Sequence, residues 1–308
     1  MRVLVTGVTG QLGYDVVKEL NARDHKFVYA PTRREMDLSD EQSIIATIEA
    51  YKPDVVFHCA AYTAVDKAEE DVKTAYTINS DATRTIAEEC KKLDSKLIYV
   101  STDYVFDGTK DLNEVYEVTD EPNPQNIYGK TKLLGEQAAL GNPKTYVVRT
   151  SWVFGKNGNN FVKTMLKLSE RFDKLTVVAD QFGSPTYTVD LAKTLVDMAE
   201  TDKYGLYQVN NNGYCNWAEF ADYILKDTDT EVKHVTTDEY YAPQYAKAEK
   251  EGRELHIAYR PKNSKLSKQA LVDAGFELLP DWTDAVDRYK EELKELNNEN
   301  NVKTLQLK

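Results

Sequence analysis

A glycine-rich turn that directly follows a short apolar run constrains the fold of this chain more than any other feature. Residues 3–5 read Val-Leu-Val, which is typical of a strand buried on both faces of a parallel sheet. Glycines then follow at intervals of three, at Gly7, Gly10 and Gly13. Residues 14–20 place their apolar side chains on one stripe of a helix. The sequence therefore predicts a strand, a glycine turn and a helix in direct succession.

The three glycines are suited to separate tasks in a dinucleotide-binding site. Gly7 permits the tight turn, Gly10 lets the backbone approach a pyrophosphate, and Gly13 lets helix and strand pack closely. The N-terminus of the helix adds unpaired N–H donors that point at the phosphates. The spacing is G-x-x-G-x-x-G instead of the common G-x-G-x-x-G of dehydrogenases. We interpret the turn as a cofactor site, the alternative being an ordinary glycine turn.

Two arginines after the second predicted strand, residues 26–30, favour a phosphorylated cofactor. In NAD-binding proteins the acidic side chain that binds the ribose lies about 20 residues beyond the glycines. Here that count arrives at Arg33, which is followed by Arg34. A guanidinium binds phosphate oxygens in a fork, so the pair favours the 2′-phosphate of NADPH. Glu35 and Asp37 reduce the local positive charge, which leaves NADH possible and a solvated loop pair as the alternative.

Strands and helices continue to alternate over the first half of the chain. The predicted elements are strands at residues 54–59, 97–101 and 145–150 and helices at residues 40–51 and 72–93. This order predicts an α/β fold, a Rossmann-type doubly wound parallel sheet. Asn79, in the second of these helices, is either a surface residue or a residue that ties neighbouring loops together. We expect residues 1–150 to form a dinucleotide-binding domain.

Beyond residue 150 the regular alternation loosens. The predicted elements here are helices at residues 160–172, 189–199, 217–225 and 281–296 and a strand at residues 175–179. Residues 180–186 are rich in turn formers. We expect residues 151–308 to form mainly a smaller, interleaved α/β substrate-binding lobe, with some segments returning to the Rossmann domain.

The charge balance and the scattered metal-binding residue types exclude several classes of function. The chain carries 39 Lys and Arg against 51 Asp and Glu, a net charge of −12, which argues against a broad nucleic-acid-binding surface. No apolar run is long enough to cross a membrane and the N-terminus lacks a signal-peptide pattern, so we expect a cytoplasmic protein without a membrane partner. The 3 cysteines and 4 histidines lack the spacing of a metal site, and we predict no metal.

A tyrosine and a lysine four residues apart, Tyr128 and Lys132, begin the helix that follows the strand at residues 97–101. Residues i and i+4 share a helix face, so the phenol and the ammonium can point into one pocket. Ser101 and Thr102 supply hydroxyls at the exit of the strand. Lowering a phenol pKa from about 10 to about 7 takes roughly 4 kcal/mol, which one charge at about 4 Å supplies at an effective dielectric near 20. We therefore expect Lys132, together with a nearby oxidised nicotinamide, to lower the pKa of Tyr128, the alternative being a solvated lysine at a helix N-terminus.

Ordered motifs along nearly the whole chain resemble a known family. They are T-G-V-T-G-Q-L-G, A-Y-T-A-V-D-K-A-E, S-T-D-Y-V-F-D-G, Y-G-K-T-K, R-T-S-W-V-F-G, D-Q-F-G-S-P-T and R-P-K-N-S. Together they resemble the extended short-chain dehydrogenase/reductases, and within them the dTDP-4-dehydrorhamnose reductases. The resemblance implies that Thr102, Tyr128 and Lys132 are catalytic and that the substrate is bound by Thr102, Asp103, Tyr128 and Trp152. With the glycine turn and the small residues after the third strand, the predicted cofactor site comprises Gly7, Gly10, Gln11, Leu12, Gly13, Arg33, Asp37, Leu38, Ala60, Ala61, Tyr62, Thr63, Tyr128 and Lys132.

The activity implied by the resemblance is NADPH-dependent reduction of the 4-keto group of dTDP-4-dehydro-L-rhamnose to dTDP-L-rhamnose. Tyr128 would protonate the carbonyl oxygen, Lys132 would orient the ribose, and Thr102 would hydrogen-bond the carbonyl. A dehydratase of this fold has an Asp-Glu pair after the strand-end threonine, whereas here Asp103 is followed by Tyr104. The alternatives are a nucleotide-sugar epimerase and a non-catalytic, NADP-binding regulatory subunit.

Some features of the chain leave its specificity and assembly open. Arg149, Arg260 and Lys262 are candidates to meet the substrate diphosphate, the alternative for each being a solvated surface charge. His58 and Cys59 stand where the family usually has Asn and Ala, and residues 236–260 look longer than the usual connection. We expect a monomer or a homodimer.

Overall fold

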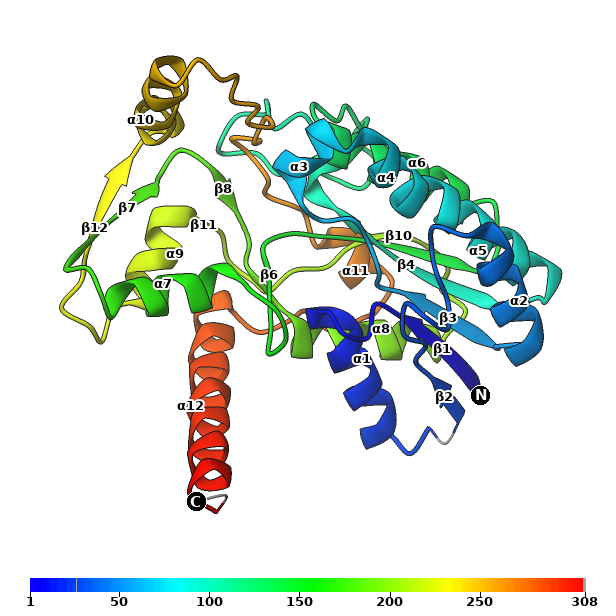
Figure 1. Ribbon diagram of the computed structural model, residues 1–308. Coiled ribbons are helices and arrows are strands. Elements are labelled where there is room, and N and C mark those ends of the chain that lie inside the picture. Colours follow the sequence, from blue (N-terminus) through cyan, green and yellow to red (C-terminus); the bar gives the residue numbers. More distant parts are fainter. Residues whose placement is uncertain (26, 307–308) are drawn as a thin grey trace.

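A six-stranded parallel sheet forms the centre of the structure (Figure 1), a computed structural model that describes residues 1–25 and 27–306. Its strands are β10 (Gly205–Gln208), β5 (Thr145–Thr150), β4 (Lys96–Thr102), β3 (Val55–His58), β1 (Arg2–Thr6) and β2 (Phe27–Tyr29), in that spatial order. Every neighbouring pair runs parallel. Residue 26, the first of the predicted second strand, lies outside the described residues. The predicted parallel α/β sheet is confirmed.

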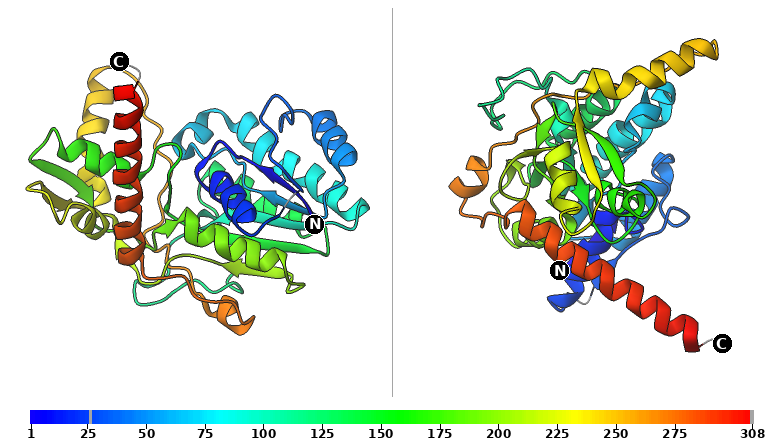
Figure 2. Two further views of the ribbon diagram at one scale, coloured as in Figure 1. Left: turned by 90° about the horizontal axis from the view of Figure 1, so that it is seen from below. Right: turned by 90° about the vertical axis from the view of Figure 1, so that its left-hand side faces the viewer.

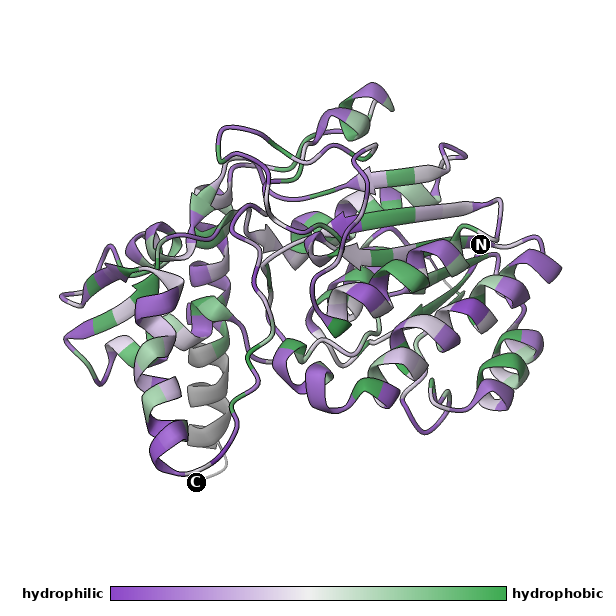
Figure 3. Ribbon diagram, turned by 90° about the horizontal axis from the view of Figure 1, so that it is seen from above, coloured by the Kyte–Doolittle hydropathy of each residue, from purple (hydrophilic) through white to green (hydrophobic). Residues whose placement is uncertain are grey.

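Helices cover both faces of this sheet (Figure 1). On one face lie α1 (Gln11–Ala22) and α8 (Thr188–Ala199), and on the other lie α2 (Glu41–Tyr51), α5 (Ala82–Lys92) and α6 (Ile127–Ala139). Because side chains alternate along a strand, Val3 and Val5 join the core under α1 and α8, whereas Leu4 joins the core under α2 and α5. Figure 3 shows hydrophobic residues along the strands and hydrophilic residues on the outer sides of the helices. The doubly wound arrangement is therefore as predicted.

A second lobe stands beside one end of the sheet (Figure 1). It contains α7 (Phe161–Ser169), α9 (Trp217–Ile224) and the parallel pair β7 (Lys174–Val178) and β12 (Glu231–Val235). Two short pairs complete it, β6 (Val153–Phe154) with β9 (Thr186–Tyr187) and β8 (Phe182–Gly183) with β11 (Cys215–Asn216). Aromatic side chains including Phe154, Phe220 and Trp282 fill its core. Helix α8 and strand β10, which lie in the sequence between β9 and β11 of this lobe, return to the central sheet and its covering layer.

The C-terminal helix α12 (Trp282–Gln306) begins in the core of this lobe and then projects away from the molecule (Figure 2). It extends ten residues past the end of the predicted helix at residue 296. Further elements that the apolar pattern did not predict are α3 (Val65–Glu70), α10 (Thr237–Lys250) and α11 (Gln269–Asp273). Each of them has only one buried side chain, so it leaves little periodic signal in the sequence.

The predicted helix at residues 72–93 is interrupted by a π-helical turn. Helix α4 (Val72–Tyr76) leads into the π turn Thr77–Asp81 and then into α5. Such turns change which side chains point inward and are frequent at functional sites. Here Asn79 is 1% exposed, and its side chain both accepts a hydrogen bond from Tyr62 N and donates one to Tyr62 O. Asn79 is thus the residue that ties loops together, not a surface residue.

Candidate functional site

The turn between β1 and α1 requires its glycines for steric reasons. Gly7 has a φ of +72°, and a Cβ there would lie 2.8 Å from the backbone nitrogen of Ala60. A Cβ on Gly13 would lie 2.4 Å from the carbonyl oxygen of Gly7. The N–H of Gly10 donates to the carbonyl oxygen of Gly7 at 2.9 Å, and a Cβ on Gly10 would lie 3.1 Å from that oxygen. The turn therefore keeps its backbone bare next to the end of β3 and at the N-terminus of α1.

A cavity of about 460 Å³ opens beside this turn, at the carboxyl edge of β1 and β3. Its lining includes seven of the predicted cofactor residues, namely Gly7, Arg33, Asp37, Leu38, Ala60, Ala61 and Tyr62. Ligands of wound α/β sheets bind at this edge, where the strand order reverses on either side of β1. The bare glycine backbone and the size of the cavity fit one nucleotide half of a dinucleotide cofactor.

Other predicted cofactor residues turn their side chains elsewhere. The Gln11 amide oxygen accepts hydrogen bonds from Gly155 N and from Asn160 Nδ2, both at 2.9 Å. Leu12 is buried in the core between the sheet and its helices. Both residues offer only their backbone to a ligand at the helix N-terminus. Thr63 is exposed and does not line the cavity.

Arg33 lies on the rim of the cavity with an uncommitted side chain. Its side chain is 83% exposed, and its only ion pair among the described residues is a loose one to Asp37 at 3.9 Å. Hydrogen bonds from the N–H and hydroxyl of Ser39 lower the pKa of Asp37. The ionised carboxylate and the mobile guanidinium thus stand on the same rim, where an adenosine ribose would bind.

The three predicted catalytic residues meet at the carboxyl edge of the sheet. Thr102 ends β4, and Tyr128 and Lys132 lie on the first turns of α6, which packs against β4. Asn126 caps this helix by accepting a hydrogen bond from Gly129 N at 2.7 Å. Because the cap fixes where the helix begins, it also fixes the direction of the phenol and the ammonium.

Burial dominates the acid–base properties of this pair. It raises the pKa of Tyr128 to about 12, although hydrogen bonding to Thr102 opposes the shift. It lowers the pKa of Lys132 to about 7. The Lys132 ammonium donates to Val100 O at 2.7 Å and lies 4.2 Å from the centre of the Tyr99 ring. The ammonium is directed to these partners, so Lys132 by itself does not lower the pKa of Tyr128. The joint effect of Lys132 and an oxidised nicotinamide on this pKa stays a prediction.

Asp103 and Tyr104 complete the wall next to Tyr128. The Asp103 carboxylate accepts hydrogen bonds from the hydroxyls of Thr102 at 3.0 Å and Ser264 at 2.6 Å. Asp103 is 3% exposed, and burial raises its pKa to about 6. The ring of Tyr104 packs edge-on against Tyr128, with centroids 5.6 Å apart. The strand-end loop thus presents one carboxyl and two phenols.

Trp152, a predicted substrate contact, packs against the hydrophobic core of the second lobe. It adopts a φ of +49°, which is uncommon for a large side chain. Its indole stacks on Trp217 with centroids 3.8 Å apart. A Cβ on Gly183 would lie 2.8 Å from the indole, so only glycine lets β8 pass beneath the ring. The strained backbone is therefore held by stacking and by close packing.

The three cations considered for the diphosphate have different surroundings. Arg149 is buried and donates to both carboxylate oxygens of Glu136, at 2.9 and 2.7 Å. It is therefore neither a solvated charge nor a ligand for the diphosphate. Arg260 donates to the Asp66 carboxylate at 2.8 Å, and Lys262 is exposed.

Residues 236–260 form α10 and a following segment that contacts α3 and the start of α6, beside the central sheet. Ala258 N donates to the carboxylate of Asp66 in α3 at 2.9 Å. Tyr259 O accepts from the side chain of Asn126, the cap of the catalytic helix, at 2.9 Å. The segment therefore joins α3 and α6 at the edge of the site. Sequence reasoning missed this role, because the contacts link residues far apart in the chain.

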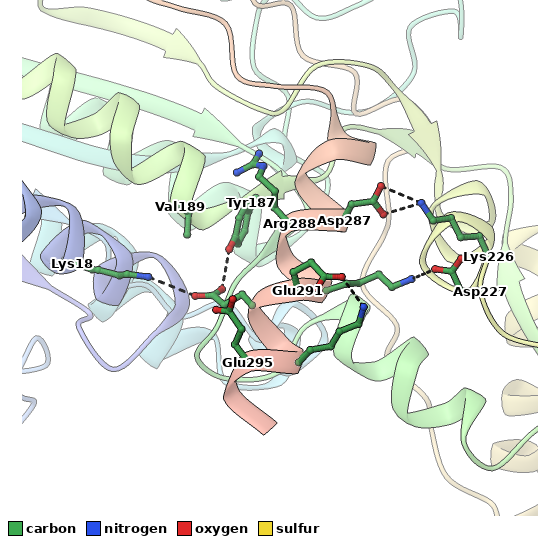
Figure 4. A pocket seen from close by; sticks show the side chains of 12 residues that line it. Lys18, Tyr187, Val189, Lys226, Asp227, Asp287, Arg288, Glu291 and Glu295 are labelled. Atoms are coloured by element: carbon green, nitrogen blue, oxygen red, sulfur yellow. Dashed lines mark hydrogen bonds and ion pairs between the residues drawn. The ribbon is translucent and has the colours of Figure 1, made fainter. Parts of the chain in front are cut away.

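A larger groove of about 710 Å³ lies away from these residues, along α12 (Figure 4). Its charged side chains pair with one another, for example Lys18 with Glu292 at 3.7 Å and Lys226 with Asp287 at 2.8 Å. No predicted site residue lines it, so its size alone does not make it the active site.

Within residues 1–25 and 27–306, no group of three or more His, Cys, Asp or Glu is arranged to hold a metal ion. In the same residues, no helix has both the length and the apolar character of a membrane span.

The sheet, the glycine turn and the Thr102–Tyr128–Lys132 group define a Rossmann-fold, NAD(P)-dependent oxidoreductase of the short-chain type. Comparison with known proteins narrows this class. Residues 1–295 match the family described as "RmlD substrate binding domain".

Three relatives illustrate the similarity. The chain is 38% identical to a dTDP-4-dehydrorhamnose reductase of Aggregatibacter actinomycetemcomitans, over 92% of this chain and 97% of that protein. It is also 38% identical to the spore coat polysaccharide biosynthesis protein SpsK of Bacillus subtilis, over 94% of this chain and 97% of that protein. The crystal structure of a Bacillus anthracis dTDP-4-dehydrorhamnose reductase in complex with NADP superposes with a TM-score of 0.86 at 37% identity, covering 94% of this chain and 99% of that one. The chain belongs to the dTDP-4-dehydrorhamnose reductase (RmlD) family of extended short-chain dehydrogenase/reductases.

Proposed function

We propose that the protein reduces the 4-keto group of dTDP-4-dehydro-L-rhamnose with NADPH and forms dTDP-L-rhamnose. One observation carries the proposal: the half-buried phenol of Tyr128 and the buried Lys132 and Thr102 stand at the same sheet edge as a glycine-lined nucleotide cavity. In our proposal residues 1–150 bind the cofactor, residues 151–308 contribute most contacts to the sugar nucleotide, and the enzyme works in the cytoplasm. The relatives' names and the NADP complex of one of them support this assignment.

The side chains of the site perform the acid–base part of this reaction. NADPH, when bound, supplies a hydride to the carbonyl carbon. Since its pKa is raised to about 12, the Tyr128 phenol is protonated at neutral pH and donates its proton to the carbonyl oxygen. Thr102 donates a hydrogen bond to that oxygen, and Lys132 orients the cofactor ribose beside it. Asp103 and Trp152 hold the sugar against the phenol.

The same residues weigh against the other reactions that this fold supports. An elimination needs a second acid for the departing hydroxyl, but a tyrosine, Tyr104, follows Asp103. A purely regulatory subunit has no need of Thr102, Tyr128 and Lys132 together. An epimerase would use the phenol but would regenerate its cofactor in each turnover. Reduction is thus the simplest chemistry that uses every group of the site.

The test is a stoichiometric assay of cofactor consumption. A dTDP-4-keto-6-deoxysugar is supplied with and without a 3,5-epimerase, and NADPH absorbance is followed together with the sugar product. We expect one NADPH to be consumed per dTDP-rhamnose formed. Sugar conversion without NADPH loss would instead identify an epimerase, and no conversion of any nucleotide sugar would revive the regulatory alternative.

Tyr128→Phe is the matched variant for this assay. It should lower turnover by at least about tenfold and leave NADPH binding intact, because general acid help is worth about 10² to 10⁴ in rate. Unchanged turnover would remove Tyr128 from its role as proton donor without affecting the identity of the reaction.

A further inference from the structure

His58 is a fully buried histidine that links two strands to a helix behind the cofactor cavity. It ends β3 and is 1% exposed. Its Nδ1 lies 2.8 Å from the hydroxyl of Thr6, the last residue of β1. Its Nε2 lies 3.2 Å from the hydroxyl of Thr83 in α5. The imidazole therefore connects the strand before the glycine turn with a helix on the other side of β3.

The direction of these hydrogen bonds follows from the groups at the two ends. The Thr83 hydroxyl donates to the carbonyl oxygen of Asn79 at 2.8 Å, so it can only accept from His58. Nε2 then carries the ring proton, and Nδ1 accepts from the Thr6 hydroxyl. The Thr6 oxygen is left to accept from Ala60 N at 3.2 Å. Every donor in this chain of hydrogen bonds finds an acceptor only if His58 is the neutral, Nε2-protonated tautomer.

Both ends of the hydrogen-bond chain reach residues of the site. Ala60 lines the cofactor cavity. At the other end, the Asn79 side chain binds the backbone of Tyr62, which lines the same cavity. Asn79 Nδ2 also donates to the hydroxyl of Thr131 at 3.0 Å, and that hydroxyl donates to Tyr128 O at 2.9 Å. One network thus holds the cavity wall at residues 60–62 and the first turn of the catalytic helix.

We propose that His58 is a positioning residue that, as a neutral imidazole, sets the wall at residues 60–62 for tight NADPH binding through the Thr6 and Thr83 hydroxyls. The proposal rests on the proposed function, since it assumes that NADPH occupies the cavity. Among the described residues, the charged group that acts on the ring is Lys132 on α6, and the ring of Tyr99 on β4 lies 5.8 Å from the imidazole between centroids. Burial lowers the pKa of His58 to about 3, with the Lys132 charge acting in the same direction. The surroundings therefore favour the neutral imidazole, and the hydrogen bonds select its Nε2-protonated tautomer.

The first test removes the two hydroxyls separately without changing side-chain shape. Thr6→Val and Thr83→Val are compared with Thr85→Val, a control that deletes a hydroxyl two residues further along α5. Among the described residues this hydroxyl donates only to Asp81 O. NADPH affinity is measured by fluorescence titration of the folded protein in the absence of sugar. We expect Thr6→Val and Thr83→Val each to weaken NADPH binding by about tenfold, as for one lost hydrogen bond in a buried network, and Thr85→Val to bind as wild type.

Kinetics separate positioning from a general loss of structure. With sugar present, we expect a KM for NADPH about tenfold higher in Thr6→Val and in Thr83→Val than in the wild type. Their kcat at saturating NADPH should stay within about twofold of the wild-type value. The proposal is overturned if both variants bind NADPH like the wild type, or if Thr85→Val weakens binding as much as they do. Because the titration needs no sugar, a protein that binds NADPH but reduces no nucleotide sugar would refute the proposed reaction alone. A wild type that does not bind NADPH would refute both.

The second test uses the charge state of His58. A histidine whose folded pKa is about 3 and whose unfolded pKa is near 6.5 binds protons preferentially when unfolded, so it removes stability as the pH falls from about 6.5 towards 3. His58→Gln cannot titrate, so its stability should fall less steeply than that of the wild type between pH 7 and pH 4, measured by denaturant unfolding. Equal slopes for the two proteins would show that His58 is not held neutral and would overturn the proposal.

Discussion

At the scale of single residues, burial and local partners decide which charges remain free for a ligand. Arg149 and Arg33 are both arginines near predicted ligand positions. Arg149 is buried against Glu136, and removing one partner would leave an unpaired buried charge. Arg33 keeps an exposed side chain on the rim of the cavity. Only Arg33 can therefore move to a phosphate without breaking the fold.

Arg33→Ala is predicted to weaken NADPH binding by about five- to tenfold and NADH binding by less than about twofold. The reason is that only NADPH carries the extra phosphate that a guanidinium can hold in a charge-assisted hydrogen bond, whose strength is reduced here by solvent. Dissociation constants for both cofactors provide the measurement, with Arg34→Ala, which lies outside the cavity lining, as the control. Equal losses for the two cofactors would make Arg33 an ordinary loop charge.

At the scale of elements, the close approach of α1 to β1 is what builds the cofactor turn. The helix begins at Gln11, and its first turn touches the carbonyl of Gly7 through Gly13. Since any Cβ at residue 13 would lie well inside van der Waals distance, the helix N-terminus keeps its position only with glycine there. The direction of the free N–H groups at the start of α1 thus depends on the close packing of Gly13 against Gly7.

Gly13→Ala is predicted to lower the free energy of unfolding by about 2 kcal/mol, as for overpacking of a tight contact, and also to weaken NADPH binding. Gly10→Ala provides the comparison, because its Cβ contact of 3.1 Å is milder. It should weaken NADPH binding but cost less than about 1 kcal/mol of stability. Denaturant unfolding and cofactor titration measure the two effects. A Gly13→Ala protein with wild-type stability would show that α1 can move without cost.

At the scale of the whole molecule, a buried cluster of polar side chains ties the second lobe to the cofactor turn. The Asn160 amide donates to Gln11 in α1 and to the Tyr289 hydroxyl in α12, both at 2.9 Å. The Tyr289 hydroxyl donates to Gly155 O at 2.6 Å. Three segments far apart in the sequence therefore meet at the base of α1, so the two lobes are expected to unfold together.

Thermal unfolding checks this coupling. We predict a single transition whose midpoint rises by about 5 °C at NADPH concentrations about 100 times Kd, where ligand binding adds about 2.7 kcal/mol of stability. Calorimetry with and without NADPH gives the measurement. Two transitions, of which NADPH moves only one, would contradict coupling through Asn160 and Tyr289.

The amino-acid sequence by itself determined the elements whose signals are local. A buried strand is a continuous apolar run, a helix carries an apolar stripe, and a glycine turn marks a backbone without side chains, so β1, α1 and the doubly wound parallel sheet could be predicted. The positions of Thr102, Tyr128 and Lys132 at one edge followed in the same way, because parallel strands and their helices end on one side.

Only the tertiary structure decided features that depend on partners distant in the chain. The Asn79 side chain, in the π turn, binds the backbone of Tyr62, and the buried imidazole of His58 lies between hydroxyls from β1 and α5. Burial raises the pKa of Tyr128 and outweighs the nearby Lys132, whose ammonium donates to a backbone carbonyl, which supports the proposed role of Tyr128 as proton donor. Desolvation and hydrogen-bond matching are properties of an enclosed volume, and residues from all parts of the chain enclose it.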